Sequence, residues 1–177
     1  MDEIEVPLEQ SQEHIHHEAM HADPKHQSMM SKAAILSAFL AVAAAVCALF
    51  SGHYANEAMI SQIKASDQWA FFQAKGIKSS ILQMQNEINP SAKLVEKTET
   101  YKKEQDQIKE NAAILEESSH HLLHKHESLA AAVTLFQVAI ALTAIAVLTR
   151  KKNFLIISSS FGLLGLIWMA KTFLTFF

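Results

Sequence analysis

The chain has 177 residues, of which 50% are hydrophobic and 19% charged, with only four Gly and three Pro. This composition is too apolar for an ordinary soluble domain of this length and supplies too few turn residues for a β-rich fold, so it favours long helices. The formal net charge of -3 offers no basic stripe for a nucleic acid, and a single cysteine, Cys47, excludes an internal disulfide.

The first predicted element is an acidic, His-rich tail, residues 1–31. Its sequence His17-Glu18-Ala19-Met20-His21 matches the H-E-x-x-H pattern, in which two histidines hold zinc and the glutamate activates water. The tail holds five His and seven acidic residues, so a chance match is easy. We therefore expect a short amphipathic helix ending at Asp23-Pro24, and a zinc hydrolase using residues 17–21 is the least favoured function.

Three apolar runs, residues 32–53, 129–149 and 153–175, each have about the length that crosses a bilayer core of roughly 30 Å. Cations lie before or at the start of the first run and between the second and third: Lys25, Lys32, Arg150, Lys151 and Lys152. Because basic flanks stay in the cytoplasm, these runs predict a membrane protein with a cytoplasmic N-terminus. The segment between the first two runs, and also the C-terminus, then lie on the outer side of the membrane, which is the periplasm in a Gram-negative bacterium.

The polar insert, residues 54–128, is predicted to form an extramembrane helical hairpin with its tip at residues 89–91, because Pro90 forbids helix continuation. Apolar residues recur in the first arm with spacings of three and four, broken only by Asp67: Ile60, Ile63, Ala70, Ala74, Ile77, Ile81, Met84 and Ile88. In the second arm they recur every seven residues: Leu94, Tyr101, Ile108, Leu115 and Leu122. Both patterns are typical of a heptad seam.

Arms that fold back at Pro90 must pair residues whose numbers have a nearly constant sum. Ala70 with Ile108, and Ile77 with Tyr101, both sum to 178. The register therefore predicts a long antiparallel coiled coil whose arms continue into the first and second membrane runs. The same repeat leaves pairing between chains open, and Asp67 is either a register device or a partner for Lys64 of a neighbouring chain.

Residues 48–78, the stretch LFQVAIALTAIAVLTRKK, and the early Glu-Val-Pro and His-Ile-His-His-Glu segments resemble a bacterial membrane family catalogued as domain of unknown function 4337. The most specific part is SDQWAFFQAKGIK, where Phe71 and Phe72 replace expected tyrosines and Gly76 replaces a common serine. The resemblance implies a bacterial inner-membrane protein with three spans, so that the N-terminus is cytoplasmic and the hairpin and the C-terminus are periplasmic. It implies no activity and no catalytic residues.

Two groups of residues are candidate sites. In the predicted register His53, Glu57, His124 and His126 gather at the membrane boundary, where they would form a metal site or a pH switch, or simply contact solvent. Trp69, Phe71 and Phe72 lie beside the seam, and Gly162 and Gly165 allow close helix approach in the third run. We expect these five at an oligomer interface, with filling of the hairpin core as the alternative for the aromatic residues.

The expected fold class is an all-α integral membrane protein with three transmembrane helices and an antiparallel coiled-coil hairpin between the first and second. No cofactor is implied. The expected partners are membrane lipid and further copies of the chain, and not nucleic acid. We expect a non-enzymatic membrane scaffold that self-associates. The alternative is a subunit of a homo-oligomeric channel or transporter. Against it, the apolar stretches 33–50, 129–148 and 154–177 contain no acid or base except Lys171.

Overall fold

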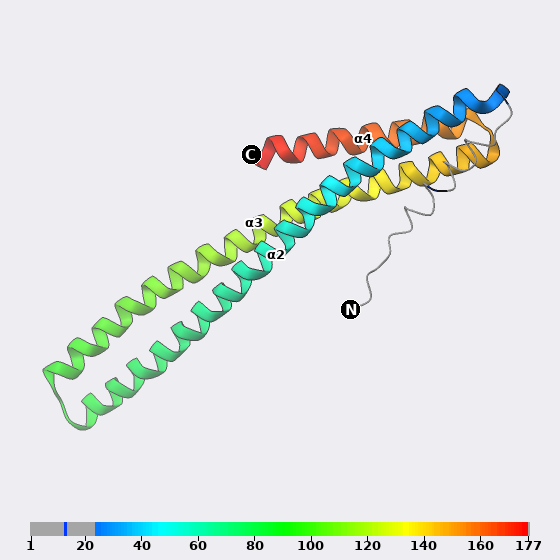
Figure 1. Cartoon of the computed structure of the whole chain (residues 1–177). Helices are drawn as coiled ribbons and strands as arrows, with labels where there is room; N and C mark the ends of the chain where they lie inside the picture. The colour runs from blue at the N-terminus through cyan, green and yellow to red at the C-terminus, as the bar shows by residue number, and fades with distance from the viewer. Residues whose placement is uncertain (1–12, 14–23, 177) are drawn as a thin grey trace. The chain divides into compact units, whose positions relative to one another are not determined.

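A computed structural model describes residue 13 and residues 24–176 of the chain. Residues 24–176 form three helices: α2, Pro24–Ile88; α3, Ala92–Thr149; and α4, Lys152–Phe176 (Figure 1). All three are long and apolar enough to cross a membrane, judged by length and composition. The short helix expected in the tail and the pattern at residues 17–21 lie outside the described residues.

The chain leaves α2 and enters α3 through Asn89-Pro90-Ser91, the segment that the sequence indicates as the tip. Asn86 closes this turn, because its side-chain Oδ1 accepts a hydrogen bond of 2.8 Å from the Ser91 backbone N–H. The Ser91 carbonyl then accepts the backbone N–H of Leu94, at 3.0 Å, and starts α3. Proline has no N–H to donate and fixes its own φ, so the helix cannot continue through this position.

The chain divides into two compact units, which we describe separately. The three-helix unit comprises α4, residues 24–53 of α2 and residues 125–149 of α3, and the two-helix unit is Tyr54–His124. Each of the helices α2 and α3 is unbroken where one unit gives way to the other.

Small side chains dominate the core of the three-helix unit, which lets its helices approach closely. Its buried residues include Ala33, Ala44, Ala132 and Ala139, with Phe136 as the largest fully buried side chain. In the same unit, the rings of Phe50 on α2 and Phe173 on α4 pack edge to face, with centroids 5.5 Å apart. The turn from α3 to α4 places Arg150 at φ 55°, in the left-handed region that side chains other than glycine seldom adopt.

The two helices of the two-helix unit run antiparallel and lie side by side (Figure 1). The Ser119 hydroxyl on α3 donates to the Ala58 carbonyl on α2 at 2.9 Å, and the Gln105 side-chain amide donates to the Phe72 carbonyl at 3.2 Å. The numbers in each of these pairs sum to 177, against 178 for the pairs expected from the sequence.

The predicted seam residues of the second arm are largely shielded from solvent. Ile108 is buried, and the other predicted seam residues of α3 in this unit are half-buried: Leu94, Tyr101, Leu115 and Leu122. Thr98, Ala112 and Ser119, which lie between them in the heptad, are buried. This face of α3 therefore contacts α2.

Candidate association surface

The contact face of α2 differs from the predicted one. In the two-helix unit the buried residues of α2 are Tyr54, Ala58, Ala65 and Ser79. Most of these side chains are small, so the two backbones approach closely enough for the Ser119 hydroxyl to reach the Ala58 carbonyl. Isoleucines at the same positions would hold the helices apart and break that hydrogen bond.

The predicted first-arm seam lies instead on the exposed side of α2. We call these nine residues the outer stripe, and all of them are exposed: Ile60, Ile63, Asp67, Ala70, Ala74, Ile77, Ile81, Met84 and Ile88. Six of them are Ile or Met side chains with exposed fractions between 44% and 86%. With about 3.5 residues per turn, the outer stripe and the contact face lie about 150° apart around the helix. The two-helix unit alone therefore leaves an apolar face uncovered.

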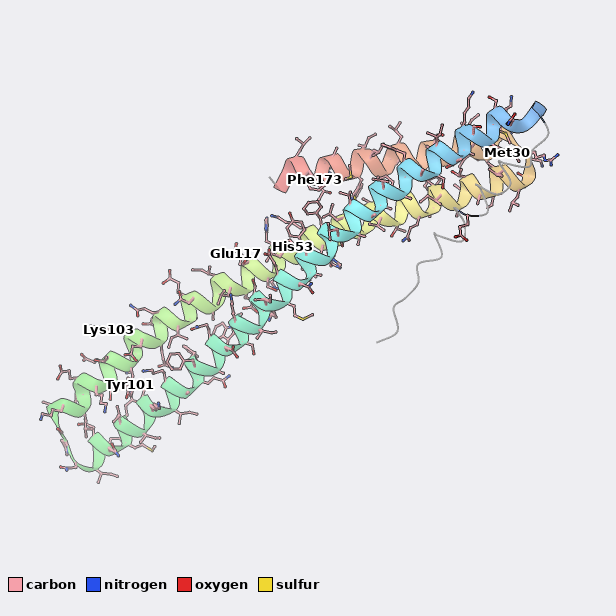
Figure 2. The ribbon with its side chains drawn as sticks, in the orientation of Figure 1. Met30, His53, Tyr101, Lys103, Glu117 and Phe173 are labelled. Atoms are coloured by element: carbon pink, nitrogen blue, oxygen red, sulfur yellow. The ribbon has the colours of Figure 1, made fainter. Side chains whose placement is uncertain are left out.

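Charged residues are more frequent on α3 than on α2 in this unit. Residues 92–124 of α3 contain twelve Asp, Glu and Lys residues, against six in residues 54–88 of α2. Two of these exposed charges on α3, Lys103 and Glu117, are labelled in Figure 2. In this unit α2 has eight exposed large hydrophobic side chains, whereas α3 has three: Val95, Ile114 and Leu123. The solvated face of the unit is therefore on α3, and the apolar face is on α2.

Between the two helices, Lys75 forms a compact cluster with α3. Its ammonium pairs with the Glu104 carboxylate and lies 4.5 Å from the ring centroid of Tyr101. The Phe71 ring centroid is 5.5 Å from the same ammonium. Figure 2 shows Tyr101 between the two helices. The side chain of Lys75 is only 16% exposed, so the carboxylate and the aromatic faces replace much of its lost hydration.

The three aromatic residues expected at an oligomer interface lie in different environments. Phe72 is half-buried on the side of α2 that contacts α3, and Trp69 packs edge to face on it with centroids 5.7 Å apart. Phe71 remains exposed. Trp69 and Phe72 therefore fit the alternative of core filling, and of the three only Phe71 exposes about half of its surface, 49%.

Gly162 and Gly165 are buried inside the three-helix unit, which differs from the predicted oligomer interface. A Cβ on Gly162 would lie 2.8 Å from the Leu40 side chain, and a Cβ on Gly165 would lie 2.7 Å from the Phe136 ring. Both glycines thus let α4 approach α2 and α3 of the same chain. As expected, the missing side chains allow two helices to approach closely, but the helices that approach are in the same chain and not in a second copy.

A hydroxyl cluster also holds α4 to α3 in this unit. Ser158 donates to the Ala139 carbonyl at 2.6 Å, and its oxygen lies 2.6 Å from the Thr143 hydroxyl. Thr143 donates to the same carbonyl at 3.0 Å. All three groups are buried and satisfied, so the cluster is a structural contact between helices and not an open polar site.

The predicted histidine site is not assembled as a metal centre. Among the described residues, no group of three or more His, Cys, Asp or Glu side chains could hold a metal ion. His126 Nδ1 lies 3.0 Å from the Ser51 carbonyl and 2.9 Å from the Ser51 hydroxyl. A carbonyl only accepts, so Nδ1 carries the proton and donates. His53, Glu57 and His124 are exposed, and a pH-sensing role for this group stays a prediction.

The sequence contained a signal for the contact face that apolarity alone does not reveal. Ala58, Ala65, Phe72, Ser79 and Asn86 are seven residues apart, the same period as the outer stripe. The contact-face residues and the outer stripe can both be paired with α3 so that the residue numbers have a nearly constant sum. Rotation of α2 about its axis changes the face that meets α3 but not the position of α3 along it. Side-chain size separates them, since small residues allow the closer approach.

The comparisons with known proteins address the family and nothing more specific. No curated protein and no solved structure matches the chain. Residues 29–175, which include almost all of α2 and α4 and the whole of α3, match the family described as Domain of unknown function (DUF4337). The match covers most of the chain, and the chain therefore belongs to this family of unknown function.

Proposed function

We propose that this chain is a non-enzymatic membrane scaffold that associates with further copies of itself through the outer stripe. Its three helices span a bacterial inner membrane with the N-terminus in the cytoplasm, and the two-helix unit is an antiparallel coiled-coil hairpin in the periplasm. The three apolar helices and the cations Arg150, Lys151 and Lys152 between α3 and α4 support this topology.

The observation that carries the proposal is the exposed outer stripe. The two-helix unit contains eighteen Asp, Glu and Lys residues in 71 positions, so this segment belongs in water and not in lipid. An apolar face of this size in water marks a contact surface. Fully burying one Ile or Met side chain contributes about 1.5–3 kcal/mol, so the six partly exposed ones would contribute about 5–10 kcal/mol per chain on association. That range is comparable with the cost of bringing chains together.

The test measures the mass of the full-length chain in mild detergent and in nanodiscs by native mass spectrometry. We expect the wild-type chain to assemble, and Ile77→Gln combined with Ile81→Gln to shift it to the 19.7 kDa monomer with unchanged helicity. The matched control is Ile114→Gln, because Ile114 is 57% exposed on α3 and Ile77 is 64% exposed on α2. It should leave the assembly intact.

A wild-type chain that stays monomeric at micromolar concentration would refute self-association. Equal loss of assembly in the Ile114→Gln control would show that the outer stripe is not the contact. Solute flux through liposomes containing the purified chain would contradict a scaffold and favour the channel or transporter alternative.

A further inference from the structure

We propose that the outer stripes of neighbouring copies pack in parallel and in register, as a three-stranded coiled coil in which the Asp67 side chains face one another. This inference rests on the proposed function, because it specifies the geometry and the stoichiometry of the same association surface.

The spacing of the outer stripe selects a helical partner of the same period. Its nine positions are separated alternately by three and four residues from Ile60 to Ile88, about 42 Å of helix. A straight α-helix drifts by about 20° per heptad relative to such a repeat, so the stripe stays in contact only with a helix that supercoils around it. Its own α3 occupies the opposite face. The matching partner is therefore the outer stripe of a second copy.

The membrane fixes the direction of pairing. All copies of one chain insert with the same orientation, so their α2 helices enter the periplasm in the same direction. Two such helices are parallel, and in a parallel coiled coil each position meets the same position of its neighbours.

Asp67 favours pairing in register over a shifted alignment. In register, the carboxylates occupy one layer between the layers of Ile63 and Ala70, and the small side chain of Ala70 leaves room for water. A shift by one heptad would place Asp67 of one copy against Ile60 or Ala74 of another, and two layers would then contain an unmatched charge. The aligned arrangement confines the charge to one layer.

The apolar positions favour more than two strands. The alternation of spacings assigns Ile60, Ile81 and Ile88 to heptad position a, and Ile63 and Ile77 to position d. No leucine is present in the stripe. Isoleucine at both a and d shifts the preference from two strands to three or more, and we assign three.

The test uses cysteine cross-linking of the full-length chain in membranes, in a Cys47→Ala background that removes the natural thiol. Ala70→Cys and Met84→Cys are made separately, and Ala113→Cys on the exposed side of α3 is the control. Mild oxidation should link both stripe variants into disulfide dimers and leave the control unlinked. In an antiparallel pair only a position on the symmetry axis meets itself, and these two positions are about 21 Å apart along the helix. Linking at both is therefore specific for parallel pairing in register.

A second variant tests the Asp67 layer and the number of chains. Asp67→Asn removes the mutual repulsion, so it should lower the dissociation constant at least several-fold and reduce its dependence on salt. Native mass spectrometry of the wild type should give about 59 kDa for three chains of 19.7 kDa each.

The failures are distinguishable. A monomeric wild-type chain would refute the proposed function together with this inference. An assembly that links through Ala113→Cys and not through the stripe variants, one that contains two chains, or one that Asp67→Asn weakens would overturn this inference alone.

Discussion

The packing of α4 against α3 can be tested by adding one methyl group at Gly165. An ideal Cβ there lies 2.7 Å from Phe136 Cε1, 2.9 Å from Cδ1 and 3.2 Å from Cζ. Phe136 is fully buried, so the ring has no open space into which it can turn. Adding a methylene-sized group to a packed core costs about 1–3 kcal/mol. Gly165→Ala should therefore destabilise the three-helix unit.

Gly52 supplies a matched control within the same unit. Nothing lies within 4 Å of an ideal Cβ at Gly52, and both glycines are inside helices. The gain from replacing a helical glycine by alanine, about 0.5–1 kcal/mol, applies to both variants and cancels in their difference. That difference isolates the packing cost, about 1–3 kcal/mol in favour of Gly52→Ala.

The assay is thermal unfolding in detergent, followed by circular dichroism at 222 nm. At about 2–4 °C per kcal/mol for a chain of this size, Gly165→Ala should melt several degrees below Gly52→Ala. Adding Phe136→Leu to Gly165→Ala should recover part of the loss, because the smaller side chain makes room for the methyl group. Equal melting temperatures for the two alanine variants would refute close packing of α4 on Phe136.

Two further substitutions test single contacts. Lys75→Met keeps the aliphatic stem but removes the ammonium that contacts Glu104 and Tyr101. It should lower the free energy of unfolding of the two-helix unit by about 1–2 kcal/mol, measured by urea unfolding. The control Lys78→Met, at an exposed position, should change it by less than about 0.5 kcal/mol. Ser37 has a buried hydroxyl with no hydrogen-bond partner among the described residues, so Ser37→Ala should stabilise the chain by about 1 kcal/mol and raise its melting temperature; a lower melting temperature would contradict this account.

The sequence was sufficient for the features that depend on spacing along the chain. Pro90 and the apolar runs indicate where the helices run, and the constant sum predicts the axial register that the Ala58–Ser119 and Phe72–Gln105 contacts show. These features follow from one-dimensional quantities: the length of a run, the position of a breaker and the distance from a turn.

The sequence was insufficient where the outcome depends on rotation about a helix axis or on which neighbour fills a space. Apolarity predicts that Ile77 and Ile81 of α2 contact α3. In the structure the contact residues are Ala58 and Ala65, because small side chains allow α3 to approach closely. Gly165 satisfies the requirement for close approach equally well within a chain or between chains. Only the position of Phe136 decides between the two.

The two faces of α2 in the two-helix unit do not compete, although both are seams. The contact face, with Ala58, Ala65 and Ser79, and the outer stripe, with Ile63 and Ile77, repeat every seven residues. A helix that supercoils so that one of these faces stays against its partner therefore also keeps the other face on one side along its length. Their side chains suit different partners. Small residues fit the antiparallel α3, where hydrogen bonds such as that between Ser119 and Ala58 add directional contacts, and the isoleucines suit the wider coil of copies that we propose. One helix can thus close the hairpin on one side and associate on the other, and the isoleucines that do not contribute to the first contact remain available for the second.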